Sequence, residues 1–130
     1  MSEKERDKLK QREEKRAKLK QELIKISLRF FKKEGYKIKK EKVLIEGYSG
    51  VLRRFDFIVQ KGRREHCVWI REWNRTIGIN VIIGLDTASD DIGLSNPLMI
   101  GDKFSDHAKS YSNRRKLMLL TKQKMIRSLR

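Results

Sequence analysis

The amino-acid sequence predicts an α/β fold in which a mixed β-sheet carries helices on both of its faces. The apolar residues are concentrated between Leu19 and Leu120, and their spacing changes along the chain from helical periodicity to alternation. Three strand-like runs follow one another in the first half, whereas strands and helices alternate in the second. A strand–helix–strand order implies a right-handed parallel unit. The 130 residues suit one small domain with one core.

The first predicted helix begins at Leu19, because apolar residues recur at steps of four, three and four from there to Phe30. Gly35 is expected to end this helix, since glycine readily adopts the left-handed conformation that follows a helix. A strand is expected over residues 36–45. Residues 46–50 form a loop whose two glycines permit a close approach of the backbone to another group.

A strand pair is predicted in the middle of the chain. Phe55, Phe57 and Val59 alternate with Asp56, Ile58 and Gln60, which is the period of a half-buried strand. Residues 61–64 supply a turn, and a second strand is expected over residues 66–73. An antiparallel pair of this kind would bring Asp56 close to a charged residue of the second strand.

The second half alternates between helices and short apolar strands. Residues 77–92 have helical spacing, although residues 79–85 also fit a buried strand. Ser105 is a suitable N-cap for a helix over residues 106–115. The remaining elements are a two-sided parallel strand over residues 98–100, a second short strand over 117–120, and a basic terminal helix over 123–129.

Residues 1–18 form a separate charged arm in front of a domain that spans residues 19–130. Mixed charges and good helix formers allow a solvated helix in the arm, which we expect to be frayed or disordered when alone. Two interpretations are open. The arm is either a solubilising tail or a basic segment that orders on a phosphate backbone.

The charge of the chain points to a polyanionic partner. Thirty-three Lys and Arg residues against seventeen Asp and Glu residues give a formal net charge of +16. Such an excess causes self-repulsion in the folded state, which a bound polyanion relieves. Nucleic acid is therefore the favoured partner, and an anionic membrane surface is much less favoured.

The composition also bears on other classes of site. Cys67 is the only cysteine, which excludes an intrachain disulfide, and His66, Cys67 and His107 are too few and too scattered for a structural zinc site. No signal peptide and no apolar run of about eighteen residues are present. We therefore expect a cytoplasmic, nucleoid-associated protein that does not bind membranes.

The order of elements and several short motifs resemble the restriction-endonuclease fold, in particular the Mrr-like branch of the PD-(D/E)xK nucleases of archaea and bacteria. The similarity covers about residues 20 to 125. The motifs that carry it are residues 47–50 (GYSG), 54–57 (RFDF), 68–73 (VWIREW), 96–100 (NPLMI), 104–108 (FSDHA) and 117–120 (LMLL).

The resemblance implies a fold, a site and a metal ion. In that family an Asp on one strand, with a Glu or Gln two residues before a Lys on the next strand, holds Mg²⁺ and positions water. Asp56 matches the first Asp and is the implied metal ligand. Arg71 stands where the Lys is expected, and Trp69 stands where the Glu or Gln is expected. Since arginine keeps its proton, Arg71 can bind phosphate but cannot act as a base.

A second carboxylate would have to come from elsewhere. Glu72 follows Arg71 directly and would point to the opposite face of a regular strand unless a bulge turned it round. Glu46, in the loop before the strand, and Glu34, at the end of the first helix, are the other candidates. If the protein is active, the catalytic residues are therefore Asp56 and Arg71 with one of these three glutamates.

The leading hypothesis is a nucleic-acid-binding protein on a nuclease-like fold, with duplex DNA favoured over RNA and cleavage lost. One alternative is an active Mg²⁺-dependent DNA endonuclease of the Mrr or resolvase type that uses Asp56. Another is a basic RNA-binding component of a ribonucleoprotein such as the ribosome. The predicted phosphate contacts are Arg53, Arg54, Lys61, Arg63, Arg64, Arg71, Arg75, Arg114, Arg115 and Lys116.

Two tryptophans stand beside the predicted site. Trp69 and Trp73 fall on the strand face of Arg71, where they either pack in the core or stack on bases. The family resemblance also implies a homodimer, since Mrr-like nucleases are commonly dimers.

Overall fold

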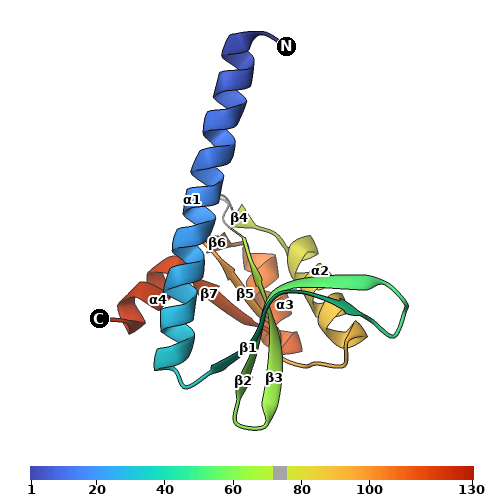
Figure 1. The fold of residues 1–130 in the computed structure, drawn as a ribbon. Coiled ribbons are helices and arrows are strands. Elements are labelled where there is room, and N and C mark those ends of the chain that lie inside the picture. The colour runs from blue at the N-terminus through green and yellow to red at the C-terminus, as the bar shows by residue number, and fades with distance from the viewer. Residues whose placement is uncertain (72–75) are drawn as a thin grey trace.

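The chain forms a five-stranded mixed sheet with helices on both faces (Figure 1). The computed structural model describes residues 1–71 and 76–130. This arrangement confirms the predicted α/β fold. In chain order the elements are α1 (Glu3–Lys33), β1 (Lys37–Glu46), β2 (Leu52–Lys61), β3 (Arg64–Ile70), β4 (Thr76–Ile77), α2 (Ile79–Asp91), β5 (Leu98–Gly101), β6 (Lys103–Phe104), α3 (Asp106–Arg115), β7 (Met118–Thr121) and α4 (Lys122–Ser128).

The strand order of the main sheet is β1-β2-β3-β5-β7. The first three strands pair antiparallel, whereas β3 with β5 and β5 with β7 pair parallel, as the sequence predicts. Strands β4 and β6 form a separate two-stranded parallel sheet, which the sequence did not predict. With only two residues each, these strands are too short for a periodic pattern.

Two apolar cores lie on opposite faces of the sheet. On one face Phe31 of α1 and Met125 of α4 pack against Phe57 and the other inward residues of the strands. On the other face Leu85 of α2 and Ala108 of α3 pack against their own set of strand residues. Burying a large apolar side chain such as Phe or Leu contributes about 1.5–3 kcal/mol, so both faces stabilise the fold.

Strand β2 is covered on both faces, and the prediction of a half-buried strand is wrong at Ile58. Phe57 and Val59 face the core of α1 and α4, whereas Ile58, only 3% exposed, faces that of α2 and α3. Phe55 also lies in the second core. On a regular strand, residues two apart point to the same face of the sheet, but Phe55 and Phe57 point to opposite faces. The regular alternation of strand β2 is therefore interrupted at Asp56, between them.

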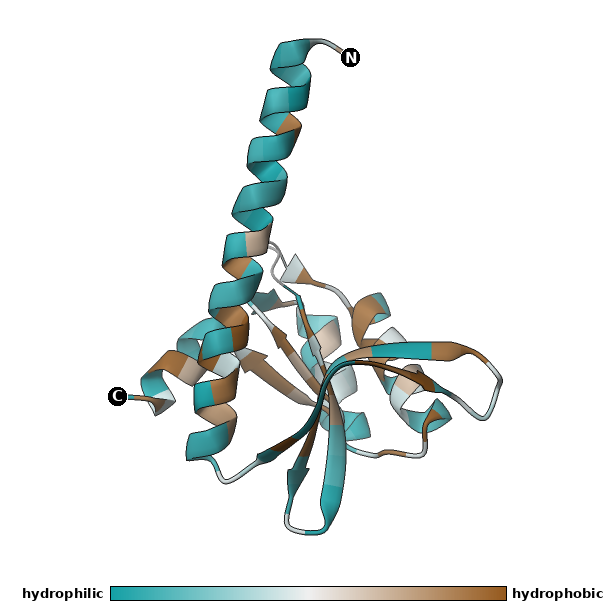
Figure 2. Cartoon of the chain, in the orientation of Figure 1, coloured by the Kyte–Doolittle hydropathy of each residue, from teal (hydrophilic) through white to brown (hydrophobic). Residues whose placement is uncertain are grey.

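Helix α1 is one continuous element that includes both the charged arm and the first apolar helix of the prediction. Residues 1–18 are exposed, whereas Leu23 and Phe30 are buried. Figures 1 and 2 show the polar N-terminal half extending beyond the body of the molecule. The helix ends at Lys33 with Glu34 as its C-cap, and Gly35 follows with a φ of 87°, the left-handed conformation expected there.

The helices of the second half follow their predicted signals. Residues 79–91 are helical, so the alternative of a buried strand over residues 79–85 is wrong. The hydroxyl of Ser105 accepts a hydrogen bond from the amide of Ala108 at 3.1 Å, which confirms the predicted cap of α3. Among the residues that the structure describes, no helix combines the length and the apolar character needed to cross a bilayer.

The loop between β1 and β2 is fastened to the end of α2 by Asp91. Its carboxylate accepts hydrogen bonds from the amide and the hydroxyl of Ser49, at 2.9 and 2.7 Å, and from Nε of Arg53 at 2.9 Å. These bonds lower the pKa of Asp91 to about 2, with the Ser49 hydroxyl as the largest cause. A Cβ at Gly47 would collide with the same carboxylate, which explains a glycine at this position.

Candidate nucleic-acid interface

Asp56 lies where strands β2 and β3 separate. The backbone ladder between them runs from the pair Lys61 and Arg64 to the pair Phe57 and Val68. Beyond it, side chains make the next bonds. The amide of Ile70 donates to Oδ2 of Asp56 at 2.7 Å, and the indole Nε1 of Trp69 donates to the carbonyl of Arg54 at 2.8 Å. The carboxylate thus replaces a backbone acceptor at the strand end.

This position belongs to what we call the carboxyl end of the sheet, where the parallel strands β3, β5 and β7 finish at Ile70, Gly101 and Thr121. In open α/β sheets, ligands bind in the crevice outside the carboxyl ends of the strands. The surroundings of Asp56 are therefore the candidate functional site.

Three basic residues surround Asp56. Nζ of Lys20, from α1, lies 3.6 Å from Oδ1 of Asp56. Lys42 of β1 and Arg54 of β2 line the same hollow, which has a volume of about 330 Å³ and which we call the Asp56 hollow. Its remaining lining is apolar, so the charge of the lining is positive. A site of this kind favours an anion over a cation.

Lys42 has a backbone conformation that is rare for lysine. Its φ is 46°, although it lies inside strand β1, and the neighbouring pairs Glu41 with Phe57 and Val43 with Phe55 place it beside Asp56. A left-handed residue with a Cβ costs roughly 1–3 kcal/mol and tends to occur at functional sites. The strained residue therefore coincides with the lining of the Asp56 hollow.

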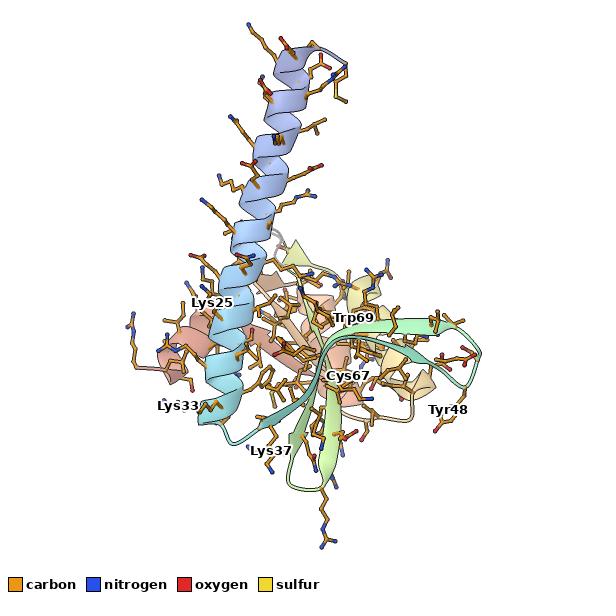
Figure 3. The ribbon with its side chains drawn as sticks, in the orientation of Figure 1. Lys25, Lys33, Lys37, Tyr48, Cys67 and Trp69 are labelled. Carbon is orange, nitrogen blue, oxygen red and sulfur yellow. The ribbon has the colours of Figure 1, made fainter. Side chains whose placement is uncertain are left out.

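Arg71 and Trp69 stack on each other on the other side of the strand end. The guanidinium carbon of Arg71 lies 4.7 Å from the centre of the Trp69 ring. The ring is half-buried and packs against the core of α2 and α3 (Figure 3). Trp69 is thus a packing residue that also holds Arg71, and the amide of Arg71 donates to the carbonyl of Ile100 at 2.8 Å. Trp73 lies outside the described residues.

The described residues around Asp56 do not fit Mg²⁺. That ion needs several oxygen ligands, usually carboxylates and water. Here one oxygen of Asp56 faces the Lys20 ammonium and the other accepts the Ile70 amide. The other residues that line the hollow are cationic or apolar and offer no further carboxylate. Within residues 1–71 and 76–130, no three Asp, Glu, His or Cys residues are grouped in a way that could hold a metal.

The proposed second carboxylates lie elsewhere or outside the described residues. Glu34 is the C-cap of α1 and accepts a hydrogen bond from Ser128, fourteen residues and roughly 21 Å along the helix from Lys20. Glu46 ends β1, four residues beyond Lys42, or about 13 Å along the strand. Glu72 is outside the described residues.

A row of basic residues on α1 leads to the Asp56 hollow. Arg12 precedes the buried Phe30 by eighteen residues, or about five turns, and Arg16 precedes the buried Leu23 by seven, or about two turns. Both therefore lie on the side of α1 that faces the body. Lys8, Arg12, Arg16 and Lys20 follow at steps of four; we call them the α1 row. Lys20 ends it in contact with Asp56.

The other side of the projecting helix has a different charge. Asp7 and Glu14 lie about 140° and 160° around the helix from Phe30 at 100° per residue. Arg6 and Lys10 also lie on that far side. The mixed charges there cancel in part, whereas the α1 row presents cations toward the carboxyl end of the sheet.

Some of the predicted phosphate contacts are instead engaged within the fold. Arg53 is bound to Asp91 in the loop described above. Arg115 binds the buried Asp86 at 2.9 Å and Asp90 at 3.4 Å, and thus fastens α3 to α2. Arg63 and Arg114 are exposed, and Arg75 lies outside the described residues.

The remaining predicted contacts gather at the opposite end of the sheet. Lys61, Arg64 and Lys116 line a second hollow, of about 500 Å³, where β3, β5 and β7 begin. The structure thus divides the predicted set between two ends. Sequence reasoning missed Lys20 and Lys42. The step of four from Lys8 to Lys20 was a usable signal for the first, whereas the second depends on a backbone conformation that no pattern predicts.

Cys67 and the two histidines do not gather into a site. Cys67 is buried beneath α2, and burial raises the pKa of its thiol to about 11, so it stays protonated at neutral pH. Nδ1 of His66 lies 3.0 Å from the carbonyl oxygen of Ser95, and His107 is exposed on α3.

Comparison with known proteins gives the fold. No model of a known protein family matches the chain, and the search of curated proteins found no match. The chain is similar to the crystal structure of AF1548, a protein of unknown function, with a TM-score of 0.67 and 15% sequence identity over 78% of this chain. The chain spans 61% of the length of AF1548. The two proteins share an α/β architecture.

Proposed function

We propose that this protein binds duplex DNA through the phosphate backbone, at the carboxyl end of the sheet and along the α1 row, and that it does not cleave its ligand. The observation that carries this proposal is the lining of the Asp56 hollow, in which Lys20, Lys42 and Arg54 surround one carboxylate. A phosphate group matches such a lining, whereas a divalent cation does not.

The shape of the molecule supports a duplex as the ligand. Figure 1 shows the projecting half of α1 rising beside the carboxyl end of the sheet. Lys20, the last residue of the α1 row, contacts Asp56 in the corner between them. Residues 3–18 extend about 24 Å, which is comparable with the width of a DNA duplex. A rigid rod of negative charge lying in this corner would contact the helix on one side and the hollow on the other.

The relation to the Mrr-like PD-(D/E)xK nucleases belongs to the same proposal. It is supported by the position of Asp56 at the separated ends of two antiparallel strands, beside a parallel pair. With Trp69 and Arg71 at the other motif positions, and with Lys20 on Asp56, we infer that the fold retains binding without cleavage. An active Mg²⁺-dependent endonuclease remains the competing hypothesis.

A titration at two salt concentrations tests the proposal. Matched duplex DNA, structured RNA and single-stranded DNA are added with Mg²⁺ present, and the products are run on a gel. We expect intact duplex to bind most tightly, with an affinity that falls steeply as salt rises. Cleaved products would show the endonuclease, and tighter binding of RNA would favour a ribonucleoprotein component.

A further inference from the structure

A second basic hollow lies at the amino end of the sheet, where β3, β5 and β7 begin. It has a volume of about 500 Å³, and its polar lining comes from Tyr36, Lys61, Arg64, His66, Asn96 and Lys116. The length of β3 separates it from the Asp56 hollow by about 20 Å. A group bound here would therefore occupy a different site from that of the proposed function.

The charge of this amino-end hollow differs from that of the Asp56 hollow. Three cationic residues line it: Lys61 and Arg64 at the turn of the β2–β3 hairpin, and Lys116 at the end of α3. Among the described residues that line the hollow, none is acidic. Several cations around one hollow, with no carboxylate among them, attract a doubly charged anion more strongly than a singly charged anion of the same size.

Lys61 and Lys116 each contact a neighbouring residue of the hollow. Nζ of Lys61 lies 5.0 Å from the centre of the Tyr36 ring, a cation–π contact. Lys116 has a φ of 60° at the end of α3, and Nδ2 of Asn96 donates to its carbonyl oxygen at 3.0 Å. Asn96 itself has a φ of 54°. Two left-handed residues are thus joined by one hydrogen bond at the rim of the hollow.

A lysine at the left-handed position after a helix is unusual, since glycine is the residue that adopts this conformation without strain. Residues strained in this way are concentrated at ligand-binding and active sites. Here the side chain contributes one of the three cations. The conformation and the charge therefore point to the same function for Lys116.

We propose that the amino-end hollow binds a phosphate monoester, carried either by a free nucleotide or by the end of a nucleic-acid strand. A monoester has a charge of about −1.5 to −2 near pH 7, whereas each phosphodiester of a continuous strand has a charge of −1. Three converging cations match the more highly charged group. The proposal does not rest on duplex binding at the carboxyl end.

Isothermal titration calorimetry with adenosine monophosphate, adenosine and inorganic phosphate tests the site. Two further probes are a single strand with a 5′-phosphate and the same strand with a 5′-hydroxyl. We expect saturable binding of the phosphorylated probes and none of adenosine. A preference for the phosphorylated strand over the mononucleotide identifies a strand end as the source, and equal affinity identifies a free nucleotide. Equal binding of the two strands, together with no saturable binding of the mononucleotide, overturns the proposal.

A matched pair of variants locates the binding. Lys116→Gly removes one cation and relieves the left-handed strain, so the fold is retained, and we expect affinity for the monophosphate to fall about tenfold. Arg63→Ala removes the same charge from the exposed turn between Lys61 and Arg64 without touching the hollow. Its effect should stay below about twofold. Equal losses in the two variants would mean a diffuse effect of net charge and would contradict the site.

Duplex DNA with 5′-hydroxyl ends separates this proposal from the proposed function. Its binding should depend on Lys42 and Arg54 of the Asp56 hollow and should hardly change in Lys116→Gly. If the native protein binds the monophosphate but not the duplex, the proposed duplex binding is contradicted and the monophosphate site is not. If it binds the duplex but not the monophosphate, the monophosphate site alone is contradicted.

Discussion

Lys20 of α1 and Asp56 of β2 form an ion pair, with 3.6 Å between Nζ and Oδ1, that joins the projecting helix to the separated ends of β2 and β3. Both side chains are partly exposed, at 42% and 19%. An ion pair of this exposure contributes little to stability, typically below about 1 kcal/mol. The ion pair matters because the Lys20 ammonium occupies the side of the Asp56 carboxylate on which a metal ion would have to bind.

Replacing Asp56 by Asn distinguishes binding from cleavage. The amide side chain of Asp56→Asn keeps an oxygen that can accept the Ile70 amide, so the strand ends stay in place, while the negative charge of the hollow is removed. A phosphate about 7 Å away would no longer be repelled, and we expect duplex DNA to bind about threefold more tightly. Fluorescence anisotropy with labelled duplex measures this change.

The control for Asp56→Asn is Glu65→Gln, which removes an exposed acid from β3 near the other end of the sheet. Its effect should be smaller than that of Asp56→Asn. Unchanged binding in Asp56→Asn, together with loss of a Mg²⁺-dependent cleavage that the native protein performs, would support the endonuclease instead.

The α1 row can be tested by charge reversal on one side of the helix. Reversing Arg12 and Arg16 to Glu should weaken duplex binding at least tenfold, and the slope of log K against log salt should become less steep by about 2, because two phosphate contacts are lost. Reversing Arg6 and Lys10 makes the same change in net charge on the far side. We expect less than a threefold loss from that second pair.

Equal losses from the two pairs of reversals would contradict a specific role for the α1 row. Circular dichroism should show the same helix content in both variants, since each replaces two good helix formers by glutamate. A ribonucleoprotein component should lose most of its binding to RNA when residues 1–18 are deleted, whereas the proposed DNA binder would lose the first three residues of the α1 row and keep the contacts of the Asp56 hollow.

Lys42→Gly separates stability from function at the Asp56 hollow. Glycine tolerates the φ of 46° without strain, but it also gains freedom in the unfolded chain. The two effects oppose each other, so the free energy of unfolding should change by less than about 1 kcal/mol. Duplex affinity should still fall several-fold, because one of three cations is lost. A large loss of stability would show that Lys42 serves the fold instead.

Acid should release the loop that Asp91 holds. Because its pKa is lowered to about 2 from an ordinary 3.8, the carboxylate contributes stability that is fully present above about pH 4 and is lost as the pH falls toward 2. In Asp91→Asn this contribution is absent at every pH. The difference in unfolding free energy between the two proteins, measured in urea, should therefore shrink between pH 5 and pH 2.5. A constant difference would contradict this assignment.

Local signals predicted most of the fold. Ser105 as a cap, Gly35 as a helix end and the apolar run at Leu98 each act within a few residues, and each appears in the structure as expected. Strand β2 was harder to predict, because the burial of Ile58 depends on α2 and α3, which follow much later in the chain. The β4–β6 pair joins segments whose sequences carry no strand period.

The candidate site was predictable only in part. The importance of Asp56 followed from its place in a strand pair, but its contact with Lys20 joins residues separated by 36 positions, and no local rule supplies such a contact. The division of the basic residues between two ends of the sheet likewise required the parallel register of β3, β5 and β7. Charge alone showed that a polyanion is the expected partner, not where it would lie.

Because α1 is one continuous helix, the direction in which each side chain of residues 3–18 points is fixed relative to the core. One extra residue between Lys20 and Leu23 would turn every residue before it by about 100° relative to the core and carry Arg12 and Arg16 out of the corner. An insertion of four residues would restore their direction to within about 40°, but would raise them by about 6 Å. Length and phase are therefore coupled in this segment, and point substitutions are easier to accommodate there than insertions.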